Sequence, residues 1–85
     1  MNAEEQNLVT KIIQLNSKGG DHSCFIRAIG NVRYLGFKII AETQTDIIGI
    51  TQDERYEAKK ENRAVITARI MKDDIQEVFT PNEIH

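Results

Sequence analysis

The sequence has few of the residues that small proteins use to reinforce a thin core. It contains one cysteine, one proline and no tryptophan among 85 residues. The single Cys24 excludes an internal disulfide, and together with only His22 and His85 it cannot form a structural zinc site. A chain of this length buries only about 60% of its unfolded surface. We therefore expect one domain that gains stability by oligomerising.

Neither sign of charge dominates, and long apolar runs are absent. Eleven Lys and Arg face 13 Asp and Glu, a net charge of −2, which argues against a broad basic face for duplex DNA but not against a local basic groove. No apolar run approaches the roughly 18 residues of a membrane span. Residues 1–7 are polar, unlike a signal peptide. These absences predict a soluble cytoplasmic protein that uses neither a membrane nor duplex DNA as a partner.

Residues 2–18 have the pattern of an amphipathic helix. Asn2 can act as the N-cap, and Glu5 three residues later completes a capping box. Gly19 and Gly20 can end the helix, because glycine readily adopts the left-handed conformation found at helix C-termini. Five apolar residues share one face at helical spacing: Leu8, Val9, Ile12, Ile13 and Leu15.

Residues 24–79 predict five short antiparallel strands. The runs 24–29 and 32–41 flank the turn signal Gly30-Asn31 and predict a hairpin. Gly36 lies inside the second run, where a residue without a side chain indicates a sharp bend or a close backbone approach. Beyond the polar loop 42–46, three more β-rich runs follow at residues 47–50, 64–70 and 75–79.

The segment 53–63 carries charges at eight of its eleven positions and predicts a solvated loop at a hairpin tip. A long C-terminal helix competes with the strands on either side of residue 71. Thr51 to Glu54 resembles a capping box, and residues 64–79 include an apolar stripe at helical spacing. A helix would place Ile66 and Ile70 on its polar face, whereas a strand puts both on one apolar side. We favour strands, and residues 64–79 stay open between two strands and one helix.

The order of these segments resembles that of Sm-like proteins (the Sm/LSm family, which includes the bacterial RNA chaperone type), from Leu8 to Pro81. The family's first motif joins a strand, a glycine turn, a strand with an internal glycine, an acidic loop and an apolar strand. Its second motif usually has the form Ile-Arg-Gly-x-Asn-Ile-x-x-Ile. The matching segments here are Phe25–Ile29, Gly30-Asn31, Val32–Ala41 around Gly36, Glu42–Asp46 and Ile47–Ile50, and for the second motif Ile70–Val78.

The resemblance implies a fold: a strongly bent, five-stranded, SH3-type small barrel over residues 24–79 with the N-terminal helix stacked on it. It also implies a homo-oligomeric ring of five to seven copies, in which the fourth strand of one subunit pairs with the fifth strand of the next. Closing a ring leaves no strand edge unpaired. The interface candidates on those strands are Val65, Ile66, Ile75 and Val78.

The resemblance further implies an RNA site in two loops, although the residues there depart from the family pattern. Asp46 takes the position of an RNA-contacting asparagine, and Gln44 lies near the position of a base-stacking residue. Met71 and Lys72 replace the arginine and glycine of the second motif, while Arg69 precedes Ile70. The RNA-binding candidates are therefore Gln44, Asp46, Met71 and Lys72. A second basic set comprises Arg27, Arg33 and Lys38.

No arrangement of residues points to catalysis, a metal or a cofactor. Cys24 and His22 are two positions apart, but no third group orients them, and a buried structural cysteine is the simpler interpretation. Asp73-Asp74 has the composition of a turn. We therefore predict a protein that is not an enzyme.

Three functional hypotheses follow. The first is an Sm-like ring that binds single-stranded RNA, as an RNA chaperone or regulator. The second is a ring that has lost RNA binding and acts as a scaffold for other proteins. The third is an unrelated accessory protein, such as a phage or mobile-element product, that binds another protein.

Overall fold

Two α-helices and six strands account for most of the chain in the computed structural model, which describes residues 3–19 and 24–80. Two 3₁₀ turns, η2 (Ile29–Asn31) and η3 (Lys72–Asp74), link β1 to β2 and β5 to β6. The predicted cap Asn2, the predicted terminator Gly20 and His22 lie outside the described residues. The elements are α1 (Ala3–Gly19), β1 (Phe25–Ala28), β2 (Val32–Tyr34), β3 (Lys38–Glu42), β4 (Asp46–Ile50), α2 (Gln52–Glu61), β5 (Ala68–Met71) and β6 (Ile75–Phe79).

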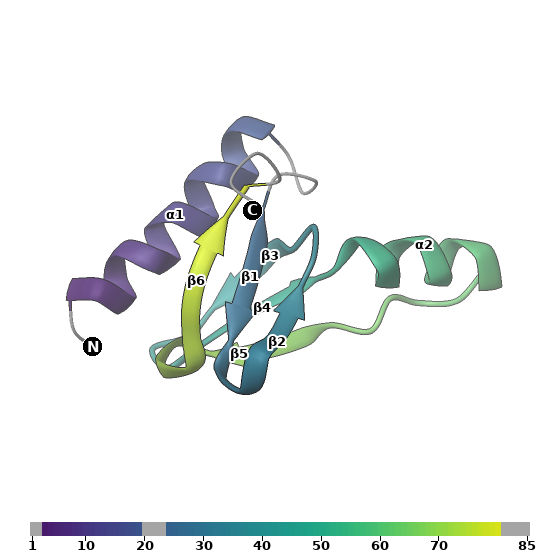
Figure 1. The fold of residues 1–85 in the computed structure, drawn as a ribbon. Helices are drawn as coiled ribbons and strands as arrows, with labels where there is room; N and C mark the ends of the chain where they lie inside the picture. Colours follow the sequence, from purple (N-terminus) through teal and green to yellow (C-terminus); the bar gives the residue numbers. More distant parts are fainter. Residues whose placement is uncertain (1–2, 20–23, 81–85) are drawn as a thin grey trace.

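The strands form two antiparallel three-stranded sheets, in the orders β2-β1-β6 and β3-β4-β5 (Figure 1). The N-terminal helix and the antiparallel strands are as predicted. The closed five-stranded barrel is wrong, because the described residues form two separate sheets and six strands.

The sixth strand arises because the predicted strand 32–41 breaks in the middle. Gly36 has φ of +63°, a left-handed conformation that ends β2 and redirects the chain into β3. β2 therefore pairs with β1, whereas β3 pairs with β4. At the break, the Phe37 N–H donates a hydrogen bond of 2.9 Å to the Cys24 carbonyl. The bend predicted from Gly36 is thus present, and it divides one strand into two.

The core lies between α1 and the two sheets. α1 packs against β6 and β3 (Figure 1) and buries Val9 and Ile12. Asn16 fixes the helix to β3, because its side-chain amide donates to the Phe37 carbonyl at 2.9 Å and its amide oxygen accepts from the Ile39 N–H at 2.7 Å. The strands and the bend contribute the remaining core side chains: Cys24, Ile26, Ala28, Phe37, Ile47, Ile70, Ile75 and Val78.

The charged segment 53–63 is mainly a helix, so the predicted hairpin loop is wrong. The Thr51 hydroxyl accepts a hydrogen bond from the Glu54 N–H at 3.3 Å and caps the N-terminus of α2. Asn62 ends the helix in the left-handed conformation, with its N–H directed to the carbonyls of residues 58 and 59. Composition concealed this helix, because Ala58 is its only buried residue.

Residues 64–79 are not one helix. They contain β5, η3 and β6, as the strand interpretation predicted. The predicted strand 64–70 is nevertheless too long at its start, because residues 64–67 are extended but pair with no other strand in the described chain. The pairing of β5 begins at Ala68, opposite Gly49.

Candidate nucleic-acid and assembly surfaces

The four RNA-binding candidates lie together at one end of the second sheet. Asp46 is opposite Met71 in the β4–β5 ladder. The Lys72 N–H donates to the Thr45 carbonyl at 2.8 Å, which joins the β3–β4 loop to η3. We call residues 42–46 and 69–74 the loop end. Thr45 and Lys72 are 27 positions apart in the sequence, and the antiparallel pairing of β4 with β5 brings their loops into contact.

Lys72 is not available to a ligand at the loop end. Its side chain is only 4% exposed, and its ammonium forms an ion pair of 2.6 Å with the carboxylate of Glu42, which is 39% exposed. An RNA phosphate could pair with Lys72 only by displacing Glu42, so one ion pair would be exchanged for another with little net gain. Because Lys72 is buried and paired, its burial does not support a role in binding RNA.

Asp46 is also neutralised, and its partner is the exposed cation of this surface. The carboxylate of Asp46, 12% exposed, accepts a hydrogen bond of 2.7 Å from the guanidinium of Arg69, which is 62% exposed. The pair spans β4 and β5 and orients the guanidinium beside the exposed Met71. Gln44 is exposed in the adjoining loop. Of the four RNA-binding candidates, Gln44 and Met71 are thus exposed, and Arg69 is the exposed cation beside them.

Sequence reasoning undervalued Arg69 and did not single out Glu42. In a β-strand, Arg69 must face away from the buried Ile70, and this alternation was the available signal for its exposure. The partner of Lys72 gave no such signal, because Glu42 lies 30 positions away and is reached only through the sheet register.

The secondary basic set does not form one patch. Arg27 and Arg33 are opposite each other on β1 and β2, whereas Lys38 begins β3 in the other sheet. The guanidinium of Arg27 is held by Glu77 at 3.2 Å and by the amide oxygen of Gln76 at 2.6 Å. Of the first hairpin's two arginines, only Arg33 is therefore left without an ion pair in the described part of the chain.

The four interface candidates separate into two pairs. Val65 and Ile66 are exposed on the extended segment before β5. Ile75 and Val78 are 5% and 3% exposed, and their side chains belong to the core of the chain. Ile75 and Val78 are three positions apart, and the irregularity of the β1–β6 ladder at Gln76 lets both side chains face the core. The backbone of β6 is left for any edge-to-edge contact.

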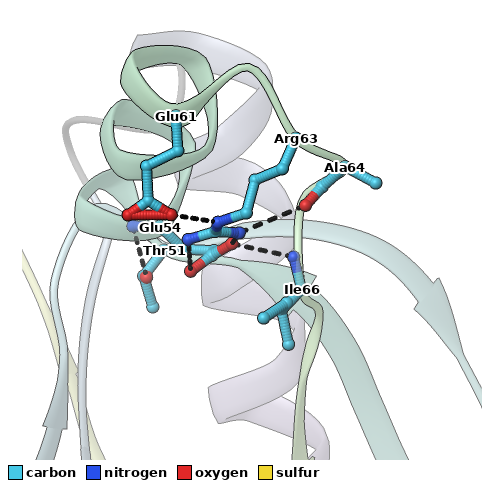
Figure 2. A network of polar contacts seen from close by, with 6 residues as sticks. All are labelled: Thr51, Glu54, Glu61, Arg63, Ala64 and Ile66. Carbon is cyan, nitrogen blue, oxygen red and sulfur yellow. Dashed lines mark hydrogen bonds and ion pairs between the residues drawn. The ribbon is translucent and has the colours of Figure 1, made fainter.

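A polar clasp joins α2 to the extended segment that follows it (Figure 2). The guanidinium of Arg63 donates to Glu54 at 2.6 Å and to Glu61 at 2.7 Å, and Glu54 accepts from the Ile66 N–H at 2.9 Å. The hydrogen bonds from Arg63 and from the Ile66 N–H lower the pKa of Glu54. The hydrogen bonds to Glu54 and Glu61 raise the pKa of Arg63. The clasp therefore orders a protruding, highly charged segment without a core of its own.

Cys24 is a buried thiol with a raised pKa. Burial raises its pKa to about 12, against a smaller opposing effect of Lys11. Because the folded pKa lies above the unfolded value of 9.0, its contribution to stability is complete below pH 9 and is lost as the pH rises from there toward 12.

We expect Cys24 in the native protein to resist a chromogenic disulfide reagent at pH 8, because the thiolate is both inaccessible and scarce. Denaturant should release one reactive thiol per chain. Rapid labelling without denaturant would contradict the burial of this side chain.

Comparison with known proteins gives no independent identification. No family model, curated protein or solved structure matches the chain. The described residues hold no cluster of three or more His, Cys, Asp or Glu that could bind a metal. No helix within those residues is both long enough and apolar enough to cross a membrane.

Proposed function

We propose that this chain is an Sm-like protein that assembles edge to edge into a ring and binds single-stranded RNA at the loop end. The observation that carries the assembly is one end strand in each sheet, β5 and β6. β5 pairs only with β4 and β6 only with β1 among the described strands, so each leaves one edge without a strand partner. Joining β5 of one copy to β6 of the next satisfies both edges and repeats until the ring closes.

Exposed apolar side chains beside β5 support the same contact. Ile66, 66% exposed, lies two positions before β5, and Met71, 51% exposed, is the last residue of that strand. The strand carries no lysine or proline to discourage pairing, and its one charged side chain, Arg69, is paired with Asp46. An edge of this composition is an aggregation hazard in a monomer. The ring removes the hazard by covering the edge with a defined partner.

For RNA, the binding group is Arg69 rather than Lys72. Its guanidinium is accessible and is oriented by Asp46, and a planar guanidinium can both pair with a phosphate and stack on a base. Gln44 adds hydrogen-bonding groups, and Met71 adds an apolar surface. A ring would present several such sites around one opening, so that weak contacts to a single strand add together.

Arg69→Gln should weaken the binding of a labelled oligo-U at least about tenfold, because each phosphate that is no longer neutralised keeps its condensed counterion. The salt slope should fall by about 0.7 for each such phosphate. Lys72→Met should leave the affinity unchanged, since Lys72 is buried. Mass by light scattering, with and without RNA, gives the ring size; a wild-type monomer would contradict the ring, and equal affinities would contradict the Arg69 site.

A specific observation favours a second function, a protein-binding scaffold. Both ionised RNA candidates are already paired, Lys72 with Glu42 and Asp46 with Arg69. With Asp73 and Asp74 included, this end carries four acids against two bases, which repels phosphate. A ring of five to seven copies that shows no RNA-dependent mass change at low salt would favour the scaffold.

A further inference from the structure

Helix α2 is an ordered element with almost no role in the core. It projects from the sheets on the side away from α1 (Figure 1), and Ala58 is its only buried residue. Isolated helices shorter than about 12 residues are marginal in water. This ten-residue helix is instead held by a cap at each end and by the Arg63 clasp (Figure 2).

The outward charges of α2 are sorted along its length. Asp53 lies in the first turn, Glu57 lies just past the midpoint, and Lys59 and Lys60 lie in the last turn. All four are exposed, and none of them forms an ion pair within the part of the chain that the structure describes. The acid of that last turn, Glu61, is paired with Arg63. The other basic residue of the helix, Arg55, faces inward and donates to the Ile50 carbonyl at 2.9 Å.

Tyr56 lies at the centre of this charge pattern. It is 66% exposed, which makes it, with Ile66, the most exposed large apolar residue described. Acidic residues at the start and basic residues at the end would stabilise α2 in a monomer as well. The exposed ring of Tyr56 lies between these charges and would gain burial from a second molecule that covers this face of α2.

We propose that α2 pairs with α2 of a second copy of this chain in antiparallel orientation. A two-fold axis near residues 56 and 57 would bring the two Tyr56 rings together. It would also place Asp53 of each copy opposite Lys60 of the other, and the opposed helix dipoles would attract. Because both copies use the same surface, the contact is self-complementary and closes after two copies.

The affinity of this α2–α2 contact rests on the proposed ring, whereas the arrangement of the two helices is independent of the ring. One tyrosine pair and two exposed ion pairs fall short of the cost of associating two free molecules. A ring presents five to seven copies of α2, and simultaneous contacts can raise the apparent affinity by about 10²-fold or more. We therefore expect two rings to stack through α2, whereas separate subunits would pair only at high protein concentration.

Tyr56→Cys provides a direct test, because the buried Cys24 leaves residue 56 as the only reactive thiol. Paired helices lie about 8–10 Å apart, so a bismaleimide of that span should give covalent dimers at high protein concentration. Arg33→Cys is the matched control, because Arg33 is also exposed but lies on β2, away from α2. It should give at least about tenfold less dimer. Equal yields from the two variants would overturn the pairing.

Charge-reversal variants distinguish cross-linking through paired α2 helices from cross-linking through random collisions. In the Tyr56→Cys background, Lys60→Asp should reduce the dimer yield by placing two carboxylates opposite each other. Adding Asp53→Lys should restore the yield, since the two helices become complementary again. Circular dichroism on each variant confirms that α2 is still folded, and failure of the double change to restore cross-linking would overturn the proposed orientation.

Light scattering distinguishes the failure of the ring from the failure of the stack. Wild-type protein should have the mass of two rings, and Tyr56→Asp should halve that mass while oligo-U affinity per ring stays constant. A wild-type mass of one ring at every concentration overturns the stack but keeps the ring. A monomer mass overturns the ring, and the cross-linking yield still decides whether α2 pairs.

Discussion

Gly49→Ala should be among the most destabilising single substitutions in the chain. A Cβ atom at residue 49 would lie closer than 3.0 Å to the Lys38 carbonyl oxygen and to the ring of Phe37. Neither neighbour can yield easily, because Lys38 is paired to β4 through the backbone and the side chain of Phe37 is fully buried. We expect a loss of about 3 kcal/mol, the upper part of the range for overpacking, measured by urea unfolding.

A loss of that size corresponds to a fall of about 12–24 °C in Tm for a domain of this length. Gly30→Ala is the matched control. A Cβ atom there meets nothing within 4 Å, and the cost is confined to the left-handed φ of +76°. We expect about 1 kcal/mol for that strain. If the two glycine variants unfold at the same urea concentration, the close approach of β3 to residue 49 is wrong.

Gly49 and Gly36 show what kind of information the sequence carries about this fold. The conformational freedom of Gly36 indicated a bend, and the bend is there. Gly49 had no visible role within the strand pattern 47–50, because its function is to admit Phe37 from a segment 12 positions earlier. Local patterns thus predicted the first helix and most strand positions, whereas contacts between distant segments stayed hidden.

Two errors in the predicted fold, the loop at residues 53–63 and the closed barrel, have separate causes. α2 was predicted as a loop because it lacks an apolar face, and its stability comes from Thr51, Asn62 and the clasp around Arg63. The capping-box resemblance at Thr51 was visible but was assigned to the competing long helix. The closed barrel was predicted from a family resemblance, and the described strands form two sheets instead.

At the loop end, the sequence predicted which segments meet but not which charges remain accessible. Lys72 was predicted to be an accessible cation, because lysine side chains are mostly exposed. The register of β4 and β5 reverses this expectation, because it buries Lys72 against Glu42 and leaves Arg69 exposed. Accessibility is a property of the assembled sheet, and it decides which residue can bind a phosphate.

Glu42→Ala and Lys72→Met should differ sharply although they remove the two halves of one ion pair. Glu42→Ala leaves an ammonium group in a side chain that is 4% exposed, without its carboxylate at 2.6 Å. An uncompensated buried charge of this kind costs about 3 kcal/mol. The free energy of unfolding, measured with urea at neutral pH, should fall by that amount.

Lys72→Met should instead change the free energy of unfolding by less than about 1 kcal/mol, because methionine fills a similar volume and needs no counter-charge. Glu42, 39% exposed in its side chain, can then be hydrated. Both variants keep the Lys72-to-Thr45 backbone hydrogen bond, so the loop end stays joined and only the charge changes. Equal losses in the two variants would show that the pair itself, rather than the burial of Lys72, dominates the energy. The expected asymmetry would identify Lys72 as a buried part of the fold. Arg69 is then the exposed cation of this surface, and it is the group proposed above to bind RNA.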